Sequence, residues 1–295
     1  MAEFEQWDIV SGVGLTALGV AAGRALESER DDRLVSDPYA GQFVAAAEET
    51  PVPVPRRVGE LAQLPERARE MWVSSAAYVG VRSRFFDRFL MGAVAGGIAQ
   101  VVVPAAGLDA RAFRLDWPAG VELFEIDQVR VLEFKEGVLG RLGARPRCGR
   151  HVVPVDLRGD WPAALRGAGF DPGRATVWLA EGLLPFLPGE AERLFFERIG
   201  ALSAPGSRLA AEHVAASVRP VVEDPEYRVV TRQLGVDIAE LWHFEGKGDP
   251  DRQLAAAGWE VRAVPVPEAA AGYGRELPGM MGRTAVHARF LTAER

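Results

Sequence analysis

The sequence predicts an α/β protein built on a doubly wound, mostly parallel sheet, and three observations support this. Short runs of β-branched and apolar residues recur through the middle of the chain. Helical or irregular segments separate these runs, and each run ends in glycine, proline or a charged residue. Strands that alternate with helices are typical of a parallel sheet covered on both faces. Strands buried on both faces read as near-continuous apolar runs, as these do.

A helical layer is expected before the sheet, over residues 1–97. Residues 11–30 carry apolar residues at helical spacing, and "SDPYAGQFVAAAEE" predicts a turn followed by a second, short helix. Residues 65–96 predict a long helix that includes the aromatic stretch "RSRFFDRFL". The opening "MAEFEQWD" lacks the basic-then-apolar layout of a secretory signal.

Residues 98–214 are expected to form the ligand-binding core, with five parallel strands. The runs are "QVVVPAAG", "VELFEID", "HVVPVDL", "ATVWLAEGL" and "SRLAAEHV", and the strand ends are expected at Gly107, Asp127, Asp156, Glu181 and Glu212.

Two further segments complete the expected single unit of residues 1–295. Residues 215–257 are rich in charge and aromatic side chains and predict a cap, or lid, over the carboxyl edge of the sheet. Within residues 258–295, "WEVRAVPV" and "TAVHARFL" predict a hairpin-like pair that places an antiparallel strand at the sheet edge. His151 and His287 fall inside predicted strands and are given no functional role.

Composition excludes several classes of function. The net charge is −7 with no basic block, so no nucleic-acid partner is expected. No apolar run approaches the ~20 residues of a membrane span. Cys148 is the only cysteine, which excludes an internal disulfide and a cysteine-based metal cluster. The four histidines show no metal-ligand spacing, so no metal is expected. We therefore expect a cytoplasmic protein; its oligomeric state does not follow from the sequence.

The residues at the strand ends favour one kind of ligand. In such a sheet, ligands bind outside the carboxyl ends of the strands. Only Gly107 remains of a glycine-rich phosphate turn in "VVVPAAGLDARAF", and carboxylates close the next four strands, which would repel a pyrophosphate. Asp127 lies about 20 residues past Gly107, the spacing of a ribose-binding carboxylate. S-adenosylmethionine, which has a sulfonium and no phosphate, therefore fits better than a nicotinamide dinucleotide.

Several motifs, in order, resemble one family over roughly residues 7–290. They are "VGLTALGVAAGRALES", "DPYAGQF", "RSRFFDRFL", "AAGLDARAFRLDWPAGVELFEIDQ", "VDLRGDWPAAL", "WLAEGLLPFLP" and "LSAPGSRLAAEH". The chain is similar to the bacterial S-adenosylmethionine-dependent methyltransferases related to leucine carboxyl methyltransferase. The resemblance implies a class I methyltransferase (Rossmann-like) fold with an N-terminal helical addition and a cap after the fifth strand.

The resemblance also implies cofactor contacts, residue by residue. Asp127 matches the ribose-binding carboxylate, Asp156 and Leu157 match the pair flanking the adenine, and Glu181 matches another cofactor contact. Arg82 matches the arginine that pairs with the methionine carboxylate, and a guanidinium suits that bidentate role.

One motif departs from the family pattern. Relatives have L-G-A-G-L-D-T-R, whereas this chain has P-A-A-G-L-D-A-R over residues 104–111, so Ala105 replaces a glycine beside Gly107. If φ at Ala105 is negative, its methyl group narrows the approach of the cofactor without preventing it. Pro104 and Ala105 also motivate an alternative, a relative that has lost catalysis; a nicotinamide oxidoreductase is the second alternative.

The reaction expected is methyl transfer to a hydroxyl or carboxyl oxygen of a small molecule, such as a natural product of secondary metabolism. A carboxylate acceptor needs no base, whereas a hydroxyl would benefit from one, and His213, His243 and Glu212 are the candidates. The cap aromatics Tyr227, Trp242 and Phe244 are expected either to line an apolar acceptor pocket or to pack within the cap. The acceptor itself, and methylation at oxygen rather than nitrogen or carbon, do not follow from the sequence.

Overall fold

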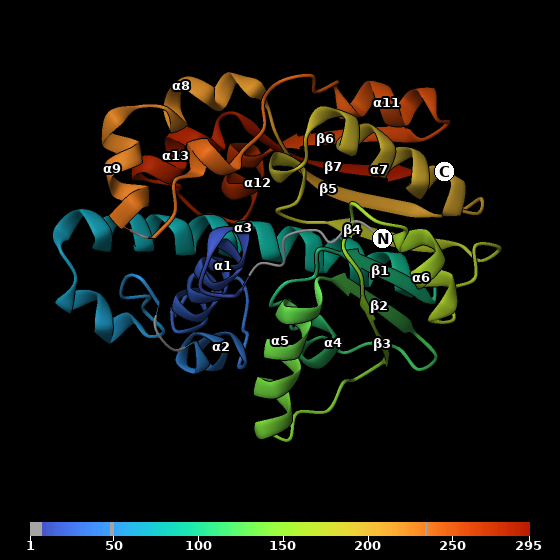
Figure 1. Cartoon of the computed structure of the whole chain (residues 1–295), viewed down its shortest axis with the longest axis horizontal. Coiled ribbons are helices and arrows are strands. Elements are labelled where there is room, and N and C mark those ends of the chain that lie inside the picture. The colour runs from blue at the N-terminus through green and yellow to red at the C-terminus, as the bar shows by residue number, and fades with distance from the viewer. Residues whose placement is uncertain (1–7, 48–49, 234) are drawn as a thin grey trace.

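The computed structural model describes residues 8–47, 50–233 and 235–295 and contains a seven-stranded sheet (Figure 1). The strand order is β3-β2-β1-β4-β5-β7-β6. The parallel strands are β1 (Gln100–Pro104), β2 (Glu122–Asp127), β3 (Gly149–Pro154), β4 (Thr176–Ala180) and β5 (Arg208–Val214). The five parallel strands predicted over residues 98–214 are thus confirmed.

The predicted strand ends hold to within a few residues. β2 ends at Asp127 as expected, whereas β1, β3 and β4 end shortly before Gly107, Asp156 and Glu181. β5 continues past Glu212 to Val214, because it pairs along its whole length with an additional strand.

The antiparallel strand does not lie where the sequence indicated. β7 (Ala288–Glu294) is antiparallel to both β5 and β6 (Glu260–Pro265) and is inserted between them, so β6 forms the edge. The two are not a hairpin, since α12 (Val266–Gly272) and α13 (Gly279–Ala285) connect them. His287 precedes β7 in a turn rather than lying within the strand, while His151 is in β3 as expected.

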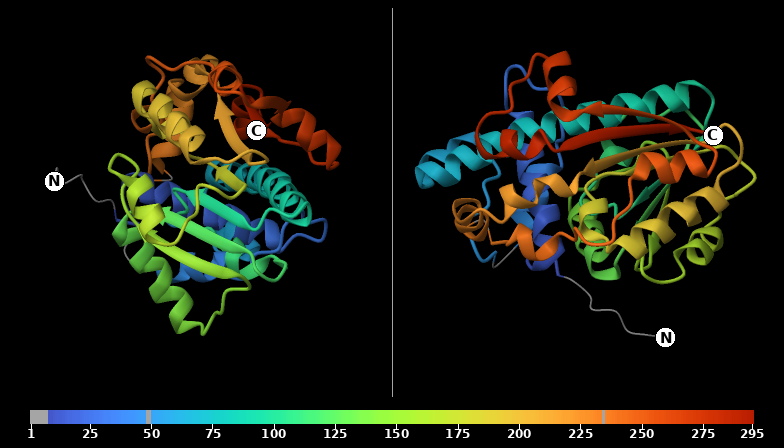
Figure 2. Two further views of the ribbon diagram at one scale, coloured as in Figure 1. Left: turned by 90° about the vertical axis from the view of Figure 1, so that its right-hand side faces the viewer. Right: turned by 90° about the horizontal axis from the view of Figure 1, so that it is seen from above.

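Helices cover both faces of the sheet. Four short helices join or follow the parallel strands: α4 (Arg111–Arg114), α5 (Val129–Arg141), α6 (Trp161–Gly167) and α7 (Gly189–Leu202), with the 3-10 turn η2 (Leu184–Phe186) before α7. Side chains alternate between two cores: Val101 and Val103 of β1 face one, and Val102 faces the other. Figure 2 shows α3 on one side of the sheet and α7 and α11 on the other.

The N-terminal helical layer forms as predicted in the described residues. It contains α1 (Gly12–Ser28), α2 (Ala40–Ala46), η1 (Val58–Gln63) and α3 (Glu66–Ala95). Buried Arg24 of α1 fixes this layer to the sheet, because it donates to Asp37 at 2.8 Å and to the Leu108 carbonyl oxygen after β1 at 2.6 Å. The expectations for residues 1–7 and for Glu48 and Glu49 lie outside the described residues.

The segment after β5 folds into short helices and turns: η3 (Ala216–Val218), α8 (Arg219–Val222), α9 (Pro225–Gln233), α10 (Ile238–Leu241) and α11 (Pro250–Ala256). Figure 1 places α8 and α9 together with α13 above α3, on the side of α3 opposite α1 and α2. Within the part of the chain that is described, no helix is both long and apolar enough to cross a membrane.

Candidate functional site

The turn after β1 is tightly bent and tied to the end of β2. Gly107 has a φ of +47° and Ala105 a φ of +51°, so both are in the left-handed region. The Gly107 amide donates to Asp127 Oδ2 at 2.6 Å, and the Gln128 amide donates to Asp127 Oδ1 at 2.7 Å. Burial raises the pKa of Asp127 to about 6 despite these two hydrogen bonds. The condition of a negative φ at Ala105, under which its methyl group would only narrow the approach of the cofactor, is therefore not met.

Asp156 follows β3 and lies beside the same edge. It accepts from the Gln128 side chain at 2.8 Å and from Arg158 Nη2 at 2.7 Å. Burial opposes ionisation of Asp156, but the hydrogen bonds from Arg158 outweigh it and lower its pKa. Leu157 is half-buried against the core that also contains Val102. The two residues thus present a carboxylate and an apolar side chain next to each other.

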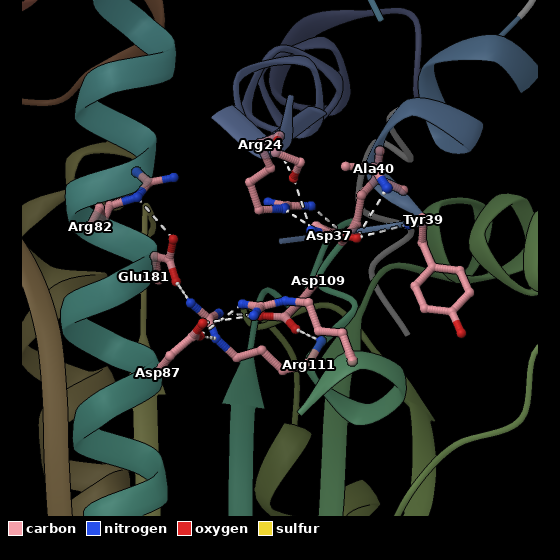
Figure 3. Close-up of polar contacts among 12 residues, drawn as sticks. Arg24, Asp37, Tyr39, Ala40, Arg82, Asp87, Asp109, Arg111 and Glu181 are labelled. Atoms are coloured by element: carbon pink, nitrogen blue, oxygen red, sulfur yellow. Dashed lines mark hydrogen bonds and ion pairs between the residues drawn. The ribbon is translucent and has the colours of Figure 1, made fainter. Parts of the chain in front are cut away.

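Helix α3 directs a buried arginine towards the ends of β4 and β5 (Figure 3). Arg82 Nε lies 2.8 Å from Glu181 Oε1, and Arg82 Nη1 lies 2.8 Å from Glu212 Oε2. Glu212 is held in turn by the Tyr78 hydroxyl at 2.6 Å and by the Gly182 amide at 2.9 Å. The result is a buried arginine and a neighbouring carboxylate in contact at the carboxyl edge of the sheet.

Arg111 continues this network towards the β1 turn. Its guanidinium contacts Glu181 Oε2 at 2.8 Å, Asp87 Oδ1 of α3 at 2.7 Å, and Asp109 (Figure 3). Arg114, one turn further along α4, pairs with Asp87 at 2.6 Å. Burial opposes ionisation of Asp109, but Arg111 outweighs it and holds the pKa of Asp109 well below its usual range.

The candidate bases lie in different places. Glu212 and His213 are successive residues of β5, so they face opposite sides of the sheet, and only Glu212 faces Arg82. His213 is buried and accepts from Arg289 Nε at 3.2 Å. Burial, reinforced by Arg289, lowers the pKa of His213 to about 4. His243 is exposed, and its amide donates to the Pro185 carbonyl at 2.8 Å.

The three cap aromatics belong to one small apolar cluster with Val218 and Val222. Tyr227 is 3 % exposed and lies in the interior of this cluster, whereas Trp242 and Phe244 are half-buried. The Trp242 ring is 6.5 Å from that of Phe186 in η2, the turn that follows Glu181. Trp242 therefore connects the cap to the loop that carries Glu181, while Tyr227 supports the cap from within.

Sequence reasoning did not assign roles to Tyr78, Asp87, Arg111 or Arg114. Asp87, Arg111 and Arg114 are charged residues inside the motifs that carry the resemblance, which was the available signal, whereas Tyr78 lies outside these motifs. Their partners are distant in sequence: Asp87 and Arg111 are 24 residues apart, and Tyr78 and Glu212 are 134 apart.

Comparison with known proteins identifies the family of the chain. Residues 17–200 match the family described as leucine carboxyl methyltransferase. A relative from Saccharopolyspora erythraea, assigned as an S-adenosyl-L-methionine-dependent methyltransferase, is 48% identical over 295 residues and covers 100% of both chains. A relative from Rhodococcus jostii with the same assignment is 48% identical over 94% of this chain and 92% of its own.

Two solved structures share the fold. A DUF574 family protein from Streptomyces avermitilis has a TM-score of 0.55 at 15% identity, over 95% of this chain and 97% of its own. A structure titled as a methyltransferase from Thermobifida fusca has a TM-score of 0.51 at 16% identity, over 94% of each chain.

The fold and the relatives define a class I, Rossmann-like methyltransferase that uses S-adenosylmethionine as its cofactor. Within that class, the chain belongs to the leucine carboxyl methyltransferase family. The expected family, fold class and cofactor are confirmed, and the protein is an enzyme. The nicotinamide oxidoreductase and the relative without catalysis are therefore set aside.

Proposed function

We propose that the enzyme binds S-adenosylmethionine along the carboxyl edge of β1 to β4 and methylates an oxygen of a small molecule. The contact between Arg82 and Glu181 carries this proposal, because an amino acid is a zwitterion that needs one positive and one negative partner side by side. Arg82 would take the carboxylate of the methionyl group and Glu181 its ammonium group.

The remaining cofactor contacts follow the strand order. The turn at Ala105 and Gly107 would lie against the methionyl end, and Asp127 would accept from the ribose hydroxyls. Asp156 and Leu157 would flank the adenine. The donor set fits the cofactor, since carboxylates occur where hydroxyl and amino groups must be bound and no cluster of phosphate-binding amides is required.

Bound S-adenosylmethionine supplies an electrophilic methyl group on a sulfonium sulfur. The side chains mainly have to position the two reactants and exclude water. A cap that packs on α3 and on the loop after β4 is suited to this, since Lys247 pairs with Glu192 of α7 at 2.8 Å and contacts the Leu184 carbonyl. We propose that Trp242 and Phe244 line the acceptor site and that Tyr227 supports it.

Between the two oxygen acceptors, we favour a carboxylate. A hydroxyl acceptor benefits from a base with a pKa near neutrality, and His213 has a pKa of about 4 and lies on the face opposite Arg82. A carboxylate is ionised at neutral pH and needs no proton removed. The site as built therefore suits ester formation better than ether formation.

Alkaline lability of the product tests this choice. A panel of small carboxylic acids and phenols is incubated with the enzyme and methyl-labelled S-adenosylmethionine. A methyl ester releases labelled methanol in mild base, whereas a methyl ether does not. If the product keeps its label through base treatment, the carboxylate proposal is contradicted. If amines are methylated and no oxygen acceptor is, the proposal of O-methylation is contradicted.

A further inference from the structure

Arg111 joins three elements that meet at the proposed cofactor site. Its guanidinium contacts Glu181 after β4, Asp87 of α3 and Asp109 of the β1 turn. Its side chain is only 4% exposed, and the side chains of its three partners are between 9% and 11% exposed. A planar guanidinium can donate hydrogen bonds to Asp87 and Asp109 while its charge lies against Glu181 as an ion pair, and an ammonium group on a flexible chain does not reproduce that geometry.

Arg111 contacts the oxygen of the Glu181 carboxylate that faces away from Arg82. Glu181 Oε1 faces Arg82 and Glu181 Oε2 faces Arg111, so the carboxylate is held between two guanidinium groups (Figure 3). A buried carboxylate needs paired cations to offset its lost hydration and to hold it in one orientation. Arg111 adds a second positive charge beside Glu181, in addition to that of Arg82, which also pairs with Glu212.

We propose that Arg111 is a positioning residue for the amino-acid end of the cofactor. It acts through Glu181, which it holds aligned with Arg82, and its pairing with Asp109 fixes the Glu181 carboxylate relative to the β1 turn. This inference rests on the proposed roles of Arg82 and Glu181. Its consequence is selective: losing Arg111 weakens recognition of the amino-acid group more than recognition of adenosine.

Arg114 provides a matched control in the same short helix. Its side chain is also 4% exposed and pairs with Asp87, but no contact with Glu181 or Asp109 is found for it among the described residues. Arg111→Lys and Arg114→Lys therefore make the same chemical change at the same depth. Only the first change removes the guanidinium group that contacts Glu181.

The experiment compares two ligands by isothermal titration. S-adenosylhomocysteine carries the amino-acid group, and 5′-methylthioadenosine has the same adenosine and thioether without it. The ratio of their dissociation constants measures how well the amino-acid group is recognised, and a general loss of folding or of the adenosine site does not change that ratio. Thermal unfolding of each variant is recorded in parallel.

In Arg111→Lys we expect the preference for S-adenosylhomocysteine to fall by roughly tenfold, or about 1.4 kcal/mol, with methylthioadenosine binding within twofold of wild type. Arg114→Lys should leave the preference within twofold. Asp109→Asn weakens the pairing of Arg111 with the β1 turn without added bulk, and it should lower the preference for S-adenosylhomocysteine by a smaller factor. If Arg111→Lys does not fold, this variant tests the positioning role instead.

Glu181→Gln separates this inference from the proposed function. If Glu181→Gln loses the preference while Arg111→Lys and Asp109→Asn keep it, the positioning role of Arg111 is wrong and the proposed site stands. If Glu181→Gln also keeps the preference, the proposed contact with the ammonium group is wrong. Equal weakening of both ligands in Arg111→Lys would make Arg111 a purely structural residue and overturn the inference.

Discussion

Replacing Ala105 with glycine should remove backbone strain at the cofactor turn. Ala105 is the non-glycine residue with positive φ among the described residues, at +51°. An L-residue other than glycine in this region costs about 1–2 kcal/mol. Glycine removes that cost. It also lowers stability by about 0.4–1 kcal/mol, because the unfolded chain becomes more flexible, and by about 0.4 kcal/mol through the loss of a half-buried methyl group. The net change in the free energy of unfolding is a gain of up to about 1 kcal/mol.

Ala110→Gly is the control for this change. Ala110 lies in the same loop, is 1% exposed and has a φ of −114°, so glycine there relieves no strain. It should lower the free energy of unfolding by about 1–2 kcal/mol, through chain entropy and a buried methyl group. Urea titration of both variants measures the difference, expected at about 2 kcal/mol in favour of Ala105→Gly. Equal destabilisation by the two changes would refute the strain argument.

Three further predictions concern the cofactor and acceptor sites. Asp127→Ala should weaken S-adenosylhomocysteine binding by roughly 1.5–3 kcal/mol in isothermal titration, and an unchanged affinity would remove the ribose role. Because the pKa of folded Asp127 is raised from 3.8 to about 6, its ionisation destabilises the fold, so wild-type stability should fall between pH 4 and 6 by up to about 3 kcal/mol relative to Asp127→Asn. The same ionisation should tighten cofactor binding as pH rises through about 6, and parallel pH profiles for the two proteins would contradict both statements. Trp242→Ala should raise the KM for the acceptor about tenfold and leave S-adenosylhomocysteine affinity within twofold, whereas a matching loss of cofactor affinity would assign Trp242 to the cofactor site.

The parallel part of the sheet could be predicted because each strand is a short apolar run with its own boundaries. The order of the last two strands could not be predicted, since strand pairing depends on what covers each face of the sheet. A signal was nevertheless present. In β7, Phe290 and Leu291 point to opposite faces and are both buried, as suits an internal strand, whereas β6 exposes Glu260 and Arg262, as suits an edge.

Arg82, Asp127 and Glu181 could be proposed as site residues from the motifs in which they lie, and the structure places them at the carboxyl edge of the sheet. The network around them was not predicted, because ion pairs such as Arg111 with Glu181 join elements that are far apart in sequence. The conformation of Ala105 was also left open, because only the folded turn determines its φ. Side-chain charge can be read from a sequence, but the partner of each charge cannot.

We propose that Arg82 and Glu181 together hold the amino-acid group of the cofactor, and a crystal structure with S-adenosylhomocysteine is the decisive measurement. We expect the ligand carboxylate on Arg82, the ammonium group on Glu181 and the ribose hydroxyls on Asp127, each at hydrogen-bond distance. A ligand bound at the same edge with its amino-acid group in solvent, and with Arg82 and Glu181 contacting only protein, would contradict it.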